Sequence, residues 1–308
     1  MLWLLFAGVA ALAYTFNTFF DNYMIDNYFT RRKSGGLMAF WFIGYTLALA
    51  VLLLTSGGFA IFGEISGLSS IAIMLFAGVL NILANIPYFK SLKYSNATEL
   101  TILWQLGPVI ALLLGVVLLD ERLEPRQLLA FGLTLAATLY IVLGSRVKRE
   151  RKASLTATFW VLITSVLWVL SDVFFVLGGR EENFAGGFAW FLIGSLGAWA
   201  MLLATQQDWR KSASSFLREK RLRKLSLVTL NQAVYTVAEF AFRAAILIAP
   251  IALVTVFDQV AEVILVFIFG IILSRLWPKI GREKLKRRII FRHLVAVVLV
   301  VISIILMQ

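Results

Sequence analysis

The chain has 308 residues, of which 60% are hydrophobic and only 15% are charged, whereas soluble domains carry about 25% charged residues. This composition excludes an ordinary soluble protein, and the absence of cysteine excludes disulfides, thiolate metal sites and a cysteine nucleophile. The net charge of +12 does not indicate nucleic acid, because the basic residues lie between apolar stretches, where they face water and lipid head groups. We therefore expect a membrane protein surrounded by lipid, with no nucleic-acid partner, metal or cofactor.

Ten apolar stretches are long enough to cross a bilayer as helices, which takes about 20 residues each. In chain order they are residues 2–20, 37–55, 70–89, 97–119, 127–144, 156–178, 186–205, 225–248, 251–274 and 289–307. The first stretch lacks the basic start of a secretory signal, so we expect it to remain as a helix. The predicted fold class is an all-α polytopic membrane protein with ten transmembrane helices.

The two halves of the chain resemble each other. Residues 101–110 align with residues 255–264 at an offset of 154, which is half the chain length, and residues 36–44 resemble residues 186–194. We therefore expect two five-helix repeats, 1–154 and 155–308. Because five is odd, the second repeat would be inserted upside down relative to the first. Inverted repeats of this kind place a binding site near the membrane midplane and allow alternating access.

The charges between the spans predict an orientation. Nearly all of the 29 Lys and Arg residues fall in the first, third, fifth, seventh and ninth connections. By the positive-inside rule these odd-numbered connections are cytoplasmic, and both termini are outside. We expect the plasma (inner) membrane as the location.

Two motifs carry a resemblance to a known family. Residues 86–97 end one span and begin the next, and a helix that carries Pro108 ends in the turn Asp120-Glu121-Arg122-Leu123. This arrangement resembles the EamA-type repeat of the drug/metabolite transporter superfamily, in which a similar helix ends in a "GERL"-like turn. The resemblance implies a ten-helix inverted-repeat transporter, often an exporter of amino acids, metabolites or drugs. Members usually keep both termini in the cytoplasm, which is the reverse of the charge prediction.

Two neighbouring spans carry most of the ionisable residues predicted to lie within the membrane. Steps of three and four residues place polar side chains on a single face of each span. On span 225–248 they are Gln232, Tyr235, Glu239 and Arg243. On span 251–274 they are Thr255, Asp258, Gln259 and Glu262. The short turn at Pro250 makes the two spans antiparallel neighbours.

Depth along these spans, at about 1.5 Å per residue, predicts which groups meet. Arg243 is level with Asp258, so we expect an ion pair near one gate. Glu239 is level with Glu262, so we expect a carboxylate pair near the midplane. Two close carboxylates in a poorly hydrated cavity do not both ionise easily, which would suit proton coupling or a cationic substrate. The alternative is a buried ion network that only locks the helices together.

The remaining candidates lie on other spans. Asn81, Asn85 and Gln105 are uncharged, and they either line a cavity or form interhelical hydrogen bonds worth about 0.6 kcal/mol each. Asp172 is a third acidic candidate. Trp104, Trp168 and Tyr235 would stack on an organic ligand or hold a cation over a ring, unless they only pack in the core or face lipid. Asp21, at the end of the first span, is expected at the membrane interface.

These observations predict a secondary transporter of small organic solutes, such as amino acids, metabolites or cationic or aromatic drugs. Export is implied by the family resemblance, and proton coupling remains an open alternative. Arg243 would bind a substrate carboxylate and a glutamate would bind an amine, and a single buried cation argues against phosphorylated substrates. No Walker-type nucleotide loop or enzymatic motif is present, so an enzyme is not expected. The other readings are an uncoupled facilitator and a non-transporting scaffold or lipid-moving protein. The chain would act as a monomer or homodimer.

Overall fold

The computed structural model describes residues 2–27, 41–63, 67–92, 106–143, 151–180, 182–207 and 222–276, together with Ile65, Trp104 and isolated positions after Gln207 and after Leu276. Regular structure in these residues is helical. In chain order the helices are α1 (Leu2–Asn27), α3 (Trp41–Thr55), the 3₁₀ helix η2 (Gly58–Gly63), α4 (Leu68–Leu92), α6 (Leu106–Leu119), α7 (Pro125–Leu143), α8 (Arg151–Gly179), α9 (Phe184–Thr205), α11 (Leu222–Ile248) and α12 (Ile251–Leu276).

Each of the first nine predicted spans overlaps one α-helix, with differences at the ends. One such difference is at α1, which continues to Asn27 instead of ending at residue 20. Within the described residues, four segments are long and apolar enough to cross a membrane, namely Leu2–Asp21, Leu68–Tyr88, Thr158–Gly179 and Phe184–Thr205. Most of the tenth predicted span lies outside the described residues, so the ten-helix inverted repeat stays a prediction.

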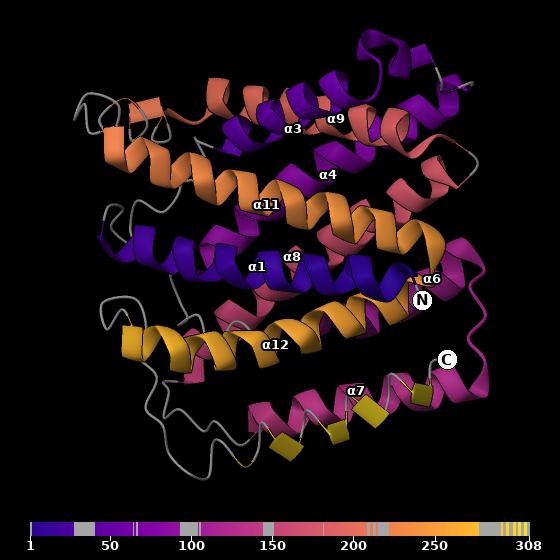
Figure 1. Cartoon of the computed structure of the whole chain (residues 1–308), viewed down its shortest axis with the longest axis vertical. Helices are drawn as coiled ribbons and strands as arrows, with labels where there is room; N and C mark the ends of the chain where they lie inside the picture. Colours follow the sequence, from indigo (N-terminus) through magenta and orange to yellow (C-terminus); the bar gives the residue numbers. More distant parts are fainter. Residues whose placement is uncertain are drawn as a thin grey trace.

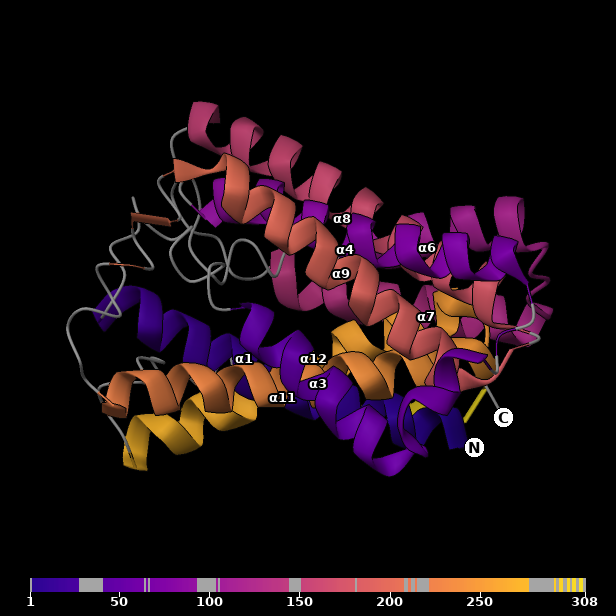
Figure 2. The ribbon, with the colours of Figure 1, turned by 90° about the horizontal axis from the view of Figure 1, so that it is seen from above.

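Eight of the described helices form a closed ring of contacts. Going round it, the order is α1, α11, α3, α9, α4, α8, α6, α12 and back to α1, while α7 packs on the outside of α12. Figure 2 shows α1, α11 and α12 on one side and α4 and α8 on the other. The ring alternates between the two halves of the sequence at several contacts, so its interior belongs to both halves.

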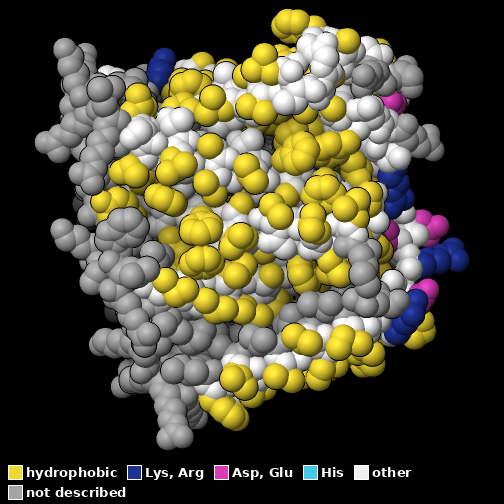
Figure 3. Space-filling model, viewed as in Figure 1, with side chains coloured by type: hydrophobic (Ala, Val, Ile, Leu, Met, Phe, Trp, Pro, Cys, Tyr) yellow, Lys and Arg dark blue, Asp and Glu magenta, His cyan; other side chains and the backbone are white. Residues whose placement is uncertain are grey.

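The outer face of the ring is apolar. In Figure 3 hydrophobic side chains cover the middle of the face, and the coloured charges lie mainly along one edge. Exposed large side chains include Leu5, Val51, Leu54 and Val117, of which Leu54 is 85% exposed. An apolar surface of this extent is unstable in water and suits contact with lipid tails. The chain is accordingly a multi-pass membrane protein.

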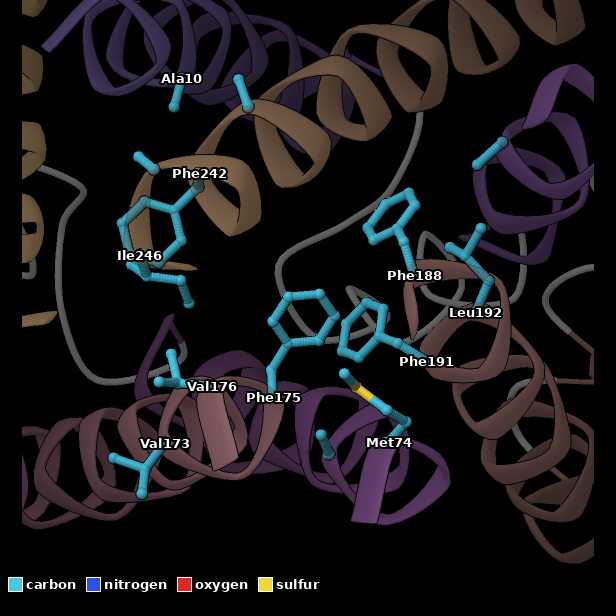
Figure 4. Close-up of a cluster of buried hydrophobic side chains, with 14 of the residues drawn as sticks. Ala10, Met74, Val173, Phe175, Val176, Phe188, Phe191, Leu192, Phe242 and Ile246 are labelled. Carbon is cyan, nitrogen blue, oxygen red and sulfur yellow. The ribbon is translucent and has the colours of Figure 1, made fainter. Parts of the chain in front are cut away.

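Small residues allow α4 and α9 to approach closely. A Cβ atom at Gly78 would overlap the backbone carbonyl of Phe191, and one at Gly194 would overlap that of Leu75. Such close approach is how helices associate in lipid, where hydrophobic burial gives little drive. Beside this contact, Phe175, Phe188 and Phe191 form a dry cluster, in which the rings of Phe175 and Phe191 meet edge to face at 5.5 Å (Figure 4).

Candidate functional site

A cavity of about 170 Å³ lies within the ring of helices. Polar and aromatic side chains from both halves of the chain line most of it. They are Tyr14, Asn17, Thr18, Asp21, Trp41, Asn81, Tyr88, Trp104, Ser165, Trp168, Asp172, Tyr235, Glu239, Arg243, Thr255, Asp258, Gln259 and Glu262, with Gly107, Val169 and Phe242 completing the wall. Ten of the twelve residues predicted for the site are among them.

Arg243 on α11 is 1% exposed and surrounded by protein groups. Its Nη1 lies 2.7 Å from Asp172 Oδ1, its Nε lies 3.5 Å from Glu239 Oε2, and its Nη2 donates to Ser171 Oγ at 3.1 Å. The rings of Phe175 and Phe191, part of the dry cluster in Figure 4, lie 5.1 and 4.4 Å from the guanidinium. A buried guanidinium needs such compensation, and two carboxylates and two ring faces supply it here.

The predicted ion pair between Arg243 and Asp258 is wrong. Arg243 instead pairs across to Asp172 on α8 and along its own helix to Glu239. The prediction considered only the hairpin of α11 and α12, whereas α11 also packs against α8. The side chain therefore had a carboxylate available on a third helix.

Glu239 and Glu262 have separate partners on α1. Glu239 Oε1 accepts hydrogen bonds from the hydroxyls of Tyr14 and Tyr235, both at 3.0 Å. Glu262 Oε1 accepts one from Thr18 at 3.0 Å. Both glutamates line the cavity, as expected from their level on the two helices, but each is tied to a different turn of α1.

Asp258 and Gln259 each carry a buried acceptor atom that receives no hydrogen bond. Asp258 is 6% exposed, and its Oδ1 receives no hydrogen bond from the protein. Gln259 Oε1 is also buried without a hydrogen-bond partner. Both residues line the cavity. These two residues therefore contribute buried acceptor atoms that the protein itself leaves without a donor.

Asp21 is buried, which corrects the expectation that it lies at the membrane interface. It is 8% exposed and lines the cavity, and its Oδ1 accepts a hydrogen bond from Asn231 Nδ2 at 2.8 Å. Asn17 Nδ2 donates in turn to Asn231 Oδ1 at 2.9 Å. The expectation failed because α1 is longer than predicted, so that Asp21 is followed by nearly two further turns of helix.

Aromatic rings form two groups on the cavity wall. Tyr88, Trp104 and Trp168 contact one another with centroids 5.4 to 5.8 Å apart. On another helix pair, Trp41 stacks on Tyr235 at 5.2 Å. Trp104, Trp168 and Tyr235 thus line the cavity, and their contact with a bound solute stays a prediction.

The uncharged candidates have mixed outcomes. Asn81 lines the cavity and donates to the hydroxyl of Tyr45 at 3.1 Å. Asn85 is buried and donates to the backbone carbonyl of Asn81, but it is not part of the wall. Gln105 lies outside the described residues. The wall residues of α1 were missed, although Tyr14, Asn17, Thr18 and Asp21 recur at helical spacing and form a polar stripe on an otherwise apolar helix.

Comparison with known proteins agrees with this architecture. Residues 1–143 match the model of the EamA-like transporter family. Over this region, somewhat less than half of its length, the chain is similar to the EamA-like transporter family. A polar cavity enclosed by apolar helices fits such a likeness.

Solved structures extend the likeness to the whole fold. One crystal structure, described only as that of a protein, superposes on 99% of this chain and 96% of its own with a TM-score of 0.70. The two sequences are 15% identical, so the likeness concerns the fold alone. A search of curated proteins finds no significant match to the sequence.

Proposed function

We propose that this chain is a secondary transporter that carries small organic solutes through the central cavity by alternating access. The observation that carries the proposal is the cavity itself, which is enclosed by helices of both halves and lined by five carboxylates and Arg243. Ionisable groups at membrane depth are costly, so they are retained mainly where they contact a substrate or an ion. The volume of the cavity, about 170 Å³, favours a small solute.

The alternating-access part of the proposal rests on a twofold relation between the halves, and matched contacts support it. Tyr14 contacts Phe242, and at the same offset of 154 residues Trp168 contacts Tyr88. Asn17 donates to the backbone carbonyl of Asn231, while its counterpart Ser171 donates to that of Ala77. Exchanged pairs of this kind are what two inverted copies packed about an axis would produce.

Export and proton coupling are finer parts of the same proposal. Export rests on the family likeness. Proton coupling rests on the acidic wall, where Asp258 and Glu262 are four residues apart on α12 and have few protein donors between them. Like charges at that spacing favour uptake of a proton or a cation. An uncoupled facilitator would use the same cavity without either.

Proteoliposomes containing the purified protein test the transport function. Ser165 lies on the cavity wall of α8, so Ser165→Phe should fill the cavity and reduce solute flux at least about tenfold. Leu162→Phe on the outer face of the same helix is the matched control, because Leu162 is 43% exposed. Flux that is equal in both variants and in the parent would exclude this cavity as the route.

A further inference from the structure

The carboxylates of the cavity outnumber its cations, and three of them have no cation as a partner. The described wall residues include one cation, Arg243, and five carboxylates, which are Asp21, Asp172, Glu239, Asp258 and Glu262. The contacts of Arg243 are with Asp172 and Glu239. Asp21 and Glu262 each accept a neutral hydrogen bond, from Asn231 and Thr18. Asp258 Oδ1 has neither an ion pair nor a hydrogen bond.

A buried carboxylate without a partner strongly favours the binding of a hydrogen-bond donor. Leaving such a group without a partner costs free energy, whereas a cation with N–H groups would restore what burial removed. The neighbouring Gln259 Oε1 is a second buried acceptor without a donor, in a residue of the same wall. A protonated amine offers up to three donors and a positive charge, which matches two acceptors and one negative charge.

The aromatic residues of the wall indicate which organic group would be attached to the amine. Tyr88, Trp104 and Trp168 provide a continuous aromatic surface for a ring or aliphatic body, and their faces attract a cation. In the described residues no group of three or more His, Cys, Asp and Glu side chains is arranged to hold a metal ion. The chemistry therefore fits an organic cation.

Arg243 does not serve a substrate carboxylate. Two carboxylates, Ser171 and the rings of Phe175 and Phe191 surround its guanidinium, and it is 1% exposed. Releasing it for a substrate would leave Asp172 and Glu239 unpaired at a large cost. This geometry reverses the expectation that Arg243 binds a carboxylate and disfavours amino acids compared with amines.

We propose that Asp258 and Gln259, together with the Tyr88–Trp104–Trp168 surface of the same cavity, form a binding site for protonated arylalkylamines. The proposal rests on the transport function above, since it names the substrate class of the same cavity. It predicts selection for an amine without a carboxylate.

Binding to the detergent-purified full chain tests this selection, with phenethylamine and phenylalanine as probes that differ by one carboxylate. Ligand-dependent thermal stabilisation gives the dissociation constants. Phenethylamine should bind at least about tenfold more tightly than phenylalanine. Asp258→Asn should weaken phenethylamine binding at least about tenfold, while the ligand-free variant is as stable as the parent or more so, because an uncompensated buried charge is removed.

Glu124→Gln is the matched control, since it removes the same charge at an exposed position beside Arg126. It should leave phenethylamine binding unchanged. Equal binding of the two probes, no binding of phenethylamine, or a normal affinity in Asp258→Asn would overturn the amine site. If proteoliposomes still move other solutes in a manner blocked by Ser165→Phe, the transport function stands without it. If nothing is moved, the transport function fails as well.

Discussion

Glu121, in the connection between α6 and α7, accepts the backbone N–H of Ile251, the first residue of α12, with oxygens at 3.2 and 3.1 Å. An acceptor there satisfies a free N–H group and lies at the positive end of the helix dipole. Arg180, after α8, lies 3.4 Å from Glu121 Oε1 and donates to the carbonyl of Leu119. Connections of both halves are thus joined at the end of the bundle where the N-terminus lies (Figure 1).

Removing this acceptor should destabilise the protein. The Glu121 side chain is 7% exposed, so Glu121→Ala leaves the Ile251 N–H without its partner in a poorly hydrated position. The loss of a helix-capping acceptor costs about 0.5–2 kcal/mol. Thermal unfolding of the purified protein measures it. Glu124→Ala is the control, because Glu124 is exposed and its ion pair with Arg126 should be worth at most about 1 kcal/mol. Equal losses in the two variants would contradict the capping role.

Glu121 should also make stability depend on pH. Burial raises the pKa of Glu121 above 4.5, although the Ile251 N–H and Arg180 oppose the shift. With a raised pKa the folded state holds the proton more tightly than the unfolded state, so the stabilisation is complete below pH 4.5 and declines as pH rises through the folded pKa. Glu121→Gln cannot titrate. The melting temperature of the parent minus that of Glu121→Gln should therefore be larger at pH 4 than at pH 7. A difference that grows with pH would show the opposite sign of shift.

The ion cluster around Arg243 gives a prediction about coupling. Arg243→Met leaves Asp172 and Glu239 buried without their cation, which should cost about 3–5 kcal/mol. Adding Asp172→Asn removes one of the stranded charges and should recover part of the loss, so the two changes are not additive. Arg180→Met, at a partly exposed position, should cost far less. Thermal unfolding of the single and double variants measures the coupling, and purely additive losses would argue against a shared cluster.

Much of this architecture was predictable because the membrane restricts the choices. Apolar length located the helices, and helical spacing placed Glu239, Asp258 and Glu262 toward a common interior. The duplication could have found Tyr14 as well, since it matches Trp168 in the other half and both residues line the cavity. These inferences needed only periodicity along one chain.

The partners of each charge were not predictable in the same way. Arg243 pairs with Asp172, which is distant in sequence, because the packing of α8 against α11 is set by many side chains together. The role of Asp21 depended on where α1 ends, and no proline or glycine marks that end in the sequence. Spacing within one helix therefore identified the wall residues better than it identified their contacts.

The orientation in the membrane gives the last prediction, and the lack of cysteine makes it simple to test. If the odd-numbered basic connections are cytoplasmic, Arg126 at the start of α7 lies outside and Arg210 lies inside. Both are exposed, so single Arg126→Cys and Arg210→Cys variants should tolerate the change. A membrane-impermeant maleimide applied to intact cells should label the Arg126→Cys variant, and it should label Arg210→Cys only after permeabilisation. The reverse pattern would place both termini in the cytoplasm, as is usual for the family, and would mean that the basic connections are exceptions to the charge rule.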